Sequence, residues 1–192
     1  MLTYLIALVS LLATLASPEA FPPAAAGFSA GVVIPSYIDH LHFVKRQLSS
    51  FEVFCIDCNG ATPILLVLSS PHETSQFGGS TGLQKLENVS VELISVQEAV
   101  HRVLPDADTS FLTELPRFKR NGKHLLQSIK KLYGCFALGT TWCFTTDSES
   151  FLVRPTSFQE ITRRYFDKEL YFTILCTLPA VVIFTKATFC LM

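Results

Sequence analysis

Short apolar runs that alternate with helical patterns constrain this chain more than any other feature of its sequence. Residues 32–34, 62–70 and 89–96 read as strands with little polar interruption, which is typical of strands buried on both faces. Residues 41–51 and 97–104 show the three- and four-residue apolar spacing of helices. This alternation predicts an α/β fold with a mostly parallel sheet and helices on its faces.

The clearest helical pattern spans residues 123–133. Its apolar face consists of Leu125, Leu126, Ile129, Leu132 and Tyr133. Its polar face carries Lys123, Gln127, Lys130 and Lys131, and we assign Lys130 to the solvated part of that face. Gly134 follows directly and is predicted to end the helix, because glycine is the preferred residue just after a helix C-terminus.

The next predicted strand spans residues 142–146, and an acidic corner follows it. Asp147-Ser148-Glu149 leads into a second short apolar strand at residues 151–153 and then into Arg154-Pro155. Two carboxylates one residue apart can meet one hard cation, and magnesium or manganese prefers such oxygen ligands together with substrate phosphates. The alternative is an exposed turn with two solvated acids. Ser157 and Glu160 then have capping-box spacing, which predicts a helix to about Phe166.

The N-terminal segment points to the secretory pathway. Residues 1–16 are apolar with no charged side chain, and small residues follow, as in a cleaved secretory signal within residues 1–20. A signal anchor, and membrane association through it, is the alternative. Residues 21–30 are rich in proline and alanine and read as a linker. Asn88-Val89-Ser90 is a glycosylation sequon, which agrees with exposure to the lumen.

Six cysteines are present, and the sequence does not fix their pairing. Cys55 and Cys58 have the spacing of a redox pair, but Asn59-Gly60 follows at once and is turn chemistry rather than the helix start of a thioredoxin-like site. A structural disulfide or two unpaired thiols is therefore favoured, and thiol-disulfide exchange stays as a weaker hypothesis. No second pair of ligands completes a zinc site.

Composition excludes several classes of protein. An apolar fraction of 49% and a charged fraction of 16% exclude a disordered chain. The net charge of −1 gives no field that would attract nucleic acid, so no nucleic-acid partner is expected. The two common glycine-rich phosphate loops and the G-x-S-x-G hydrolase elbow are absent from the sequence.

As an ordered set, four motifs resemble nucleotide-diphospho-sugar transferases of the glycosyltransferase A-type fold, and in particular a group of uncharacterised glycosyltransferases. The motifs are V-V-I-P-S-Y at residues 32–37, P-I-L-L-V-L-S-S at 63–70, the lysine-bearing helix at 122–132, and D-S-E-S-F-L-V-R-P at 147–155. This resemblance implies a metal-dependent glycosyltransferase that moves sugar from a nucleotide-diphosphate donor to an unknown glycan, lipid or protein acceptor in the endoplasmic reticulum or Golgi lumen, or after secretion.

The resemblance also implies roles for individual residues. Asp147 and Glu149 would hold manganese or magnesium. Donor-binding residues would be Pro35, Ser36, Tyr37, Lys123, Gln127, Lys131, Asp147 and Arg154. Arg154 would contact a phosphate or Asp147, with a structural ion pair as the alternative. No catalytic base is assigned, and the five histidines show no metal-ligand spacing.

The C-terminal segment departs from that family. Residues 31–169 form the expected donor-binding domain, whereas residues 170–192 are apolar, contain Pro179 and match no further part of the fold. A truncated sequence whose tail is not native is favoured over a short membrane segment. Residues 170–174 are expected to add a strand, with the rest poorly packed. Activity is thereby in doubt, and a non-catalytic lumenal binding protein that keeps only the α/β scaffold is the alternative function.

Overall fold

The structure is a computed structural model that describes residues 29–58, 62–79, 86, 89–117, 119–161 and 182–185. The predicted signal segment, most of the predicted linker and the sequon residue Asn88 lie outside these ranges. So do residues 170–174, which were expected to add a strand.

Five strands form one sheet. They are β1 (Ala30–Pro35), β2 (Ile64–Leu68), β3 (Val91–Ser95), β4 (Trp142–Thr145) and β5 (Val182–Thr185). Their order across the sheet is β3-β2-β1-β4-β5, with the first four parallel and β5 antiparallel to β4. The predicted fold class, α/β with a mostly parallel sheet, is therefore confirmed.

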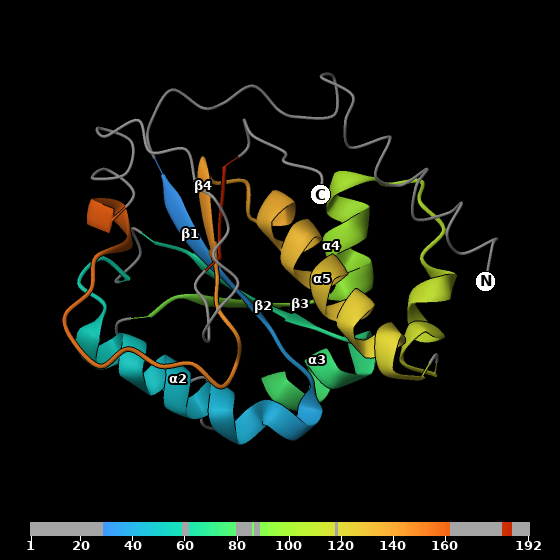
Figure 1. Cartoon of the computed structure of the whole chain (residues 1–192), viewed down its shortest axis with the longest axis horizontal. Coiled ribbons are helices and arrows are strands. Elements are labelled where there is room, and N and C mark those ends of the chain that lie inside the picture. The colour runs from blue at the N-terminus through green and yellow to red at the C-terminus, as the bar shows by residue number, and fades with distance from the viewer. Residues whose placement is uncertain are drawn as a thin grey trace.

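Helices cover both faces of the sheet (Figure 1). Helices α2 (Leu41–Phe54) and α3 (Pro71–Gly78) pack on one face, whereas α4 (Val96–Val103) and α5 (Lys119–Leu138) pack on the other. Neighbouring residues of β1 face opposite sides, so Val32 and Ile34 join the core under α2 while Val33 joins the core under α5. Burial of β1 and β2 on both faces explains why their sequences are continuous apolar runs.

The glycine predicted to end helix α5 lies inside it. A Cβ at Gly134 would lie 2.7 Å from Val33 Cγ1 and 2.9 Å from Val67 Cγ2, so Gly134 lets the helix approach β1 and β2 closely. The helix continues to Leu138, and Gly139, with φ of 71°, follows it in the left-handed region that glycine favours. The predicted stop was therefore five residues too early.

Two helical regions were not predicted. Helix α3 follows β2 directly, with Pro71 in its first turn and the Ser70 hydroxyl accepting from the Glu73 backbone nitrogen. No helix or strand was predicted between residues 104 and 123, yet this region contains the short 3-10 helices η3 (Ser110–Thr113) and η4 (Leu115–Arg117). Leu112 and Leu115 from these turns are buried against α4 and α5.

The segment after β4 is extended but is not a strand. Residues 147–156, here called the strap, leave the carboxyl end of β4 and run along α2 (Figure 1). The predicted second strand at residues 151–153 is wrong, because Phe151 and Val153 are exposed and no sheet partner among the described residues pairs with them. The end of the strap pairs with the end of α2 through an isolated bridge between Cys55 and Thr156.

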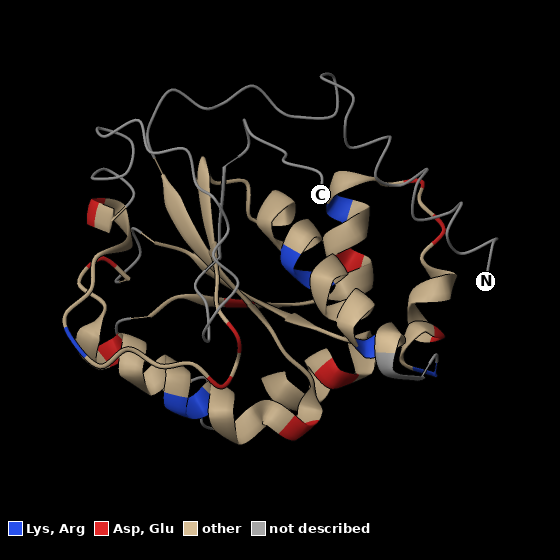
Figure 2. Cartoon of the chain, viewed as in Figure 1, with Lys and Arg blue, Asp and Glu red and all other residues tan. Residues whose placement is uncertain are grey.

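Part of the apolar tail joins the sheet. Strand β5 pairs Phe184 with Cys143 and Ile183 with Phe144, although these residues belong to the portion of the tail expected to be poorly packed. Across the residues that the structure covers, no helix is long and apolar enough to cross a membrane. Figure 2 shows acidic and basic residues interspersed over the helices rather than gathered in one region.

Candidate functional site

The strand order reverses between β1 and β4, and the carboxyl ends of these two strands are where an open α/β sheet has its crevice. The chain leaves β1, builds β2 and β3 on one side of it, and then returns to place β4 on the other side. In open α/β sheets, ligands bind outside the carboxyl ends of the strands where the strand order reverses in this way. Here Ser36 and Tyr37 follow β1, and the acidic corner Asp147–Glu149 follows β4.

Asp147 is the first residue of the strap and meets a lysine from α5. Its Oδ1 lies 2.9 Å from Lys131 Nζ, with side-chain exposures of 46% for Asp147 and 23% for Lys131. The carboxylate is thus paired with a cation while still reachable from solvent. A group in that state can exchange its partner for a bound metal or ligand at modest cost, because exposed ion pairs contribute little to stability.

His40, a residue without a predicted role, contacts the other two residues of the acidic corner. Its Nδ1 lies 2.7 Å from Ser148 Oγ, and its Nε2 lies 3.4 Å from Glu149 Oε1. The Tyr37 ring stacks against the imidazole with centroids 3.8 Å apart. Burial raises the pKa of Tyr37, and the nearby charges of Glu149 and Asp39 add to the effect. Residues from the ends of β1 and β4 are thereby joined in one cluster.

Gln47 holds the acidic corner from α2. Its side-chain nitrogen donates to Thr146 Oγ1 and to the carbonyl oxygen of Asp147, both at 3.2 Å. Gln47 is 1% exposed, so the donating side-chain amide is shielded from water. This amide fixes the backbone at the point where β4 becomes the strap.

Lys130 is buried, which corrects its assignment to a solvated helix face. Its ammonium donates to the carbonyl oxygen of Ser36 and to Ser69 Oγ, so it bridges the carboxyl ends of β1 and β2. Burial lowers the pKa of Lys130 to about 8, and Glu73 opposes that shift. Lys130 is 1% exposed, so its ammonium connects the ends of β1 and β2 and is not accessible from solvent.

The predicted donor-binding residues do not all converge. Pro35 ends β1 and Ser36 is fully buried beside it, whereas Tyr37 is half-buried in the crevice. Lys131 contacts Asp147, and Gln127 lies one helical turn earlier, half-buried. Lys123 is exposed, and it lies eight residues before Lys131, which is about 12 Å along the axis of α5.

Arg154 lies seven residues into the strap, and its side chain is exposed. No ion pair of Arg154 appears among the described residues, where Asp147 is paired with Lys131 instead.

Two carboxylates at this corner fit a hard divalent cation in their chemistry. Glu149 has a side-chain exposure of 61% and Asp147 of 46%, so both can turn toward a shared ion. One or two carboxylates plus ligand phosphates are the usual donor set for magnesium. If this corner binds a metal, Asp147 and Glu149 are the residues that could hold it, and in the structure they contact Lys131 and His40.

Four of the six cysteines form two disulfides among the described residues. Cys55 pairs with Cys58, and Cys135 of α5 pairs with Cys143 of β4. Cys55, Asp57 and Cys58 bring candidate metal-ligand atoms within 4.8 Å of one another, but the disulfide leaves no thiolate to bind a metal. Of the two alternatives favoured for the C-x-x-C pair, a structural disulfide or two unpaired thiols, the structure contains the disulfide.

A shallow groove runs between α2 and the strap, beside the acidic corner rather than in it. Its lining residues are Lys45, Arg46, Ser49, Ser50, Phe54, Phe151, Leu152 and Val153. Arg46 sits over the Phe151 ring, with 5.9 Å from the guanidinium carbon to the ring centroid. The groove contains neither Asp147 nor Glu149.

Comparison with known proteins gives distant similarity only. No protein-family model matches the chain, and no curated protein matches it. Among solved structures, it is similar to core-mannan synthase A from Aspergillus fumigatus in its Mn/GDP form, with 14% identity, a TM-score of 0.45, and coverage of 81% of this chain and 44% of that one. It is also similar to mouse xyloside xylosyltransferase 1 in its apo form, with 11% identity, a TM-score of 0.44, and coverage of 74% and 49%.

Both names denote glycosyltransferases, the class that the sequence motifs resemble. This chain spans about half the length of each solved chain. At such identities and TM-scores, neither similarity assigns an activity to this chain, whose function is therefore argued from its own residues.

Proposed function

We propose that this chain binds a nucleoside-diphosphate sugar together with a divalent metal, as the donor-binding part of a glycosyltransferase. One observation carries the proposal. Asp147 stands at the reversal point of the strand order, reachable by solvent and 2.9 Å from Lys131. A carboxylate for a metal and a lysine for phosphate are the two charges that a metal-diphosphate complex requires.

Each residue of the crevice has a part in this proposal. Asp147 and Glu149 would hold manganese or magnesium, and a bound metal would neutralise part of the diphosphate charge. Lys131, which pairs with Asp147, would supply a positive charge for a phosphate oxygen. Tyr37 offers a flat ring beside the nucleotide, held in place by its stacking on His40. Gln47 keeps the Asp147 backbone fixed throughout.

We further propose that the chain works in the lumen of the secretory pathway or outside the cell. Two disulfides among the described residues support an oxidising compartment, where such bonds persist. The uncharged N-terminal segment supports the same location. The acceptor is a glycan, lipid or protein, and membrane association through residues 1–20 belongs to this proposal.

Calorimetric titration of UDP and GDP, each with and without Mn²⁺, tests the proposal. We expect one of the two nucleotides to bind in the presence of Mn²⁺ and to lose most of its affinity when EDTA removes the metal. Absence of metal-dependent binding with either nucleotide would overturn the proposal. Binding without transfer or hydrolysis of the matching sugar nucleotide would instead favour the alternative, a binding protein that keeps only the scaffold.

A further inference from the structure

Helix α2 holds the strap along its whole length, from the acidic corner to the end of the helix. At the near end, Gln47 donates to Thr146 and to the Asp147 carbonyl. Near the middle, the backbone nitrogen of Leu152 donates to Ser50 Oγ at 2.9 Å. These bonds come from the seventh and tenth of the 14 residues of α2, so the helix sets the path that the strap follows.

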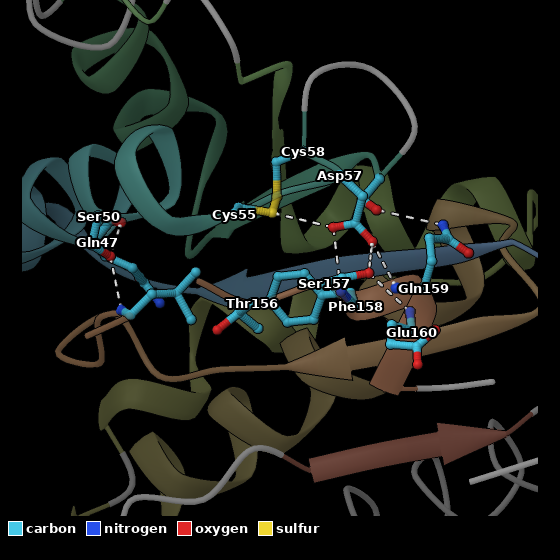
Figure 3. Close-up of a disulfide and its surroundings, with 12 residues drawn as sticks. Gln47, Ser50, Cys55, Asp57, Cys58, Thr156, Ser157, Phe158, Gln159 and Glu160 are labelled. Carbon is cyan, nitrogen blue, oxygen red and sulfur yellow. Dashed lines mark hydrogen bonds between the residues drawn. A yellow bond between two sulfur atoms is a disulfide. The ribbon is translucent and has the colours of Figure 1, made fainter. Parts of the chain in front are cut away.

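At the far end, the strap is joined to the turn that follows α2. The Thr156 backbone nitrogen donates to the Phe54 carbonyl at 2.8 Å, and the Ile56 nitrogen donates to the Thr156 carbonyl at 2.9 Å. Asp57 then accepts three hydrogen bonds at the start of the helical residues 158–161: 2.9 Å from Ser157 Oγ, 3.3 Å from the Phe158 nitrogen and 2.7 Å from the Gln159 nitrogen. Figure 3 shows Asp57 pointing from the disulfide turn toward these groups.

The Cys55–Cys58 disulfide encloses Asp57. Cys55 is the first residue beyond α2 and Cys58 is 1% exposed in the core, so the bond ties the end of the helix to a fixed point. Asp57 lies between the two cysteines, and the direction of its carboxylate depends on the conformation of this closed turn. A carboxylate that accepts several backbone N–H bonds makes charge-assisted bonds, which are stronger than neutral ones.

From these contacts we propose that Asp57, held by the Cys55–Cys58 disulfide, is a positioning residue that fixes the far end of the strap and thereby the placement of Asp147 and Glu149. The strap contains no helix or strand, so its order depends on its attachments, since each backbone residue fixed in one conformation costs about 1–2 kcal/mol of entropy. The effect on nucleotide binding rests on the proposed function. The effect on strap order does not.

Hydrogen exchange followed by mass spectrometry tests strap order without any ligand. The variants are Asp57→Ala, Asp57→Asn, which keeps one acceptor oxygen, and the double replacement Cys55→Ser/Cys58→Ser. Asp106→Ala, an exposed acid in a remote turn, is the matched control. We expect exchange over residues 147–156 to rise about tenfold in Asp57→Ala and in the double replacement, less in Asp57→Asn, and not at all in the control, where tenfold corresponds to 1.4 kcal/mol.

Titration of UDP and GDP with Mn²⁺ in the same variants supplies the second readout, and we expect affinity to fall about fivefold or more in Asp57→Ala. Faster exchange confined to residues 157–161, with residues 147–156 unchanged, would overturn the positioning role. Unchanged nucleotide affinity in a variant with a loosened strap would overturn the link to the site. If the wild-type chain binds neither nucleotide, the proposed function fails, and the exchange data alone decide whether Asp57 orders the strap. Asp57→Asn and the double replacement keep the test available if Asp57→Ala does not fold.

Discussion

Lys131 Nζ and Asp147 Oδ1 lie 2.9 Å apart, which connects α5 to the corner that follows β4. The pair is only partly buried, so it contributes little to stability, and surface ion pairs generally give about 0–1 kcal/mol. Its position at the carboxyl ends of the parallel strands, rather than its strength, makes it informative. If this pair separates, the acid can bind a metal and the lysine can bind a phosphate of the diphosphate.

Replacement of Lys131 should therefore separate binding from folding. In Lys131→Gln we expect the free energy of unfolding to change by less than about 1 kcal/mol. We expect Mn²⁺-dependent nucleotide affinity to fall about tenfold, because a charge-assisted bond to phosphate is lost. Lys45→Gln on α2 is the control, and calorimetric titration is the measurement. Equal affinity in Lys131→Gln and Lys45→Gln would remove Lys131 from the site.

Lys130 should make stability depend on alkaline pH. Because burial lowers its folded pKa to about 8 from 10.5, the unfolded chain binds more protons between these two values. The penalty of burying the charge is fully present below about pH 8 and disappears as the pH rises through the unfolded value. Relative to Lys130→Met, the wild-type free energy of unfolding should rise by up to about 3 kcal/mol across that interval.

Urea denaturation of wild-type chain and Lys130→Met, at pH values from about 8 to about 10.5, measures this difference. The comparison cancels the titration of all groups that the two chains share. Parallel stability curves over the interval would contradict the burial of a charged Lys130.

Gly134 should not tolerate a side chain. The Cβ of Gly134→Ala would lie 2.7 Å from Val33 Cγ1 and 2.9 Å from Val67 Cγ2, so α5 must move away from the sheet. Such overpacking costs about 1–3 kcal/mol of stability, measurable by urea denaturation. At Gly79 the nearest atom is 3.5 Å away, so Gly79→Ala is the control and should be nearly neutral. A neutral Gly134→Ala would mean that α5 is not packed as described.

The disulfides should be found by peptide mapping under non-reducing conditions. We expect linked peptides that contain Cys55 with Cys58 and Cys135 with Cys143. The second bond ties α5 to β4 across the core that supports the acidic corner. Replacing both of its cysteines with alanine should lower stability by about 2–4 kcal/mol. Detection of Cys143 linked to any other cysteine would contradict the packing of β4 against α5.

The strands could be predicted from sequence because β1 and β2 are buried on both faces, which leaves continuous apolar runs. The same reasoning failed at residues 151–153, because Phe151 and Val153 lie exposed on the strap. The β-propensity of a residue depends mostly on packing against neighbouring strands, and the sequence alone does not show whether such neighbours are present. Helix α3 was missed because Pro71 directly follows residues 62–70, which were predicted only as a strand. The serine before Pro71, with Glu73 three residues beyond it, is nevertheless a capping signal.

In the candidate site, too, some features could be read from the sequence and others could not. Asp147 and Glu149 could be singled out from the sequence because they follow a buried strand, and their metal-binding role stays a prediction, while the structure pairs Asp147 with Lys131 and Glu149 with His40. Lys130 could have been recognised as buried, since it lies four residues after Leu126 and three before Tyr133, on the apolar face. His40 and Gln47 could not, because their partners are about a hundred residues away in the chain and only the fold brings them together.

Asp147 is the residue through which we propose that the chain binds a divalent metal together with a nucleoside diphosphate. The most direct measurement is calorimetric titration of UDP and GDP, with Mn²⁺ present and absent, into wild-type chain, Asp147→Asn and the control Asp106→Asn. We expect Mn²⁺-dependent binding in the wild type and the control, and at least about a tenfold loss in Asp147→Asn, or 1.4 kcal/mol. Binding that is the same in all three chains, or that ignores Mn²⁺, would contradict this proposal.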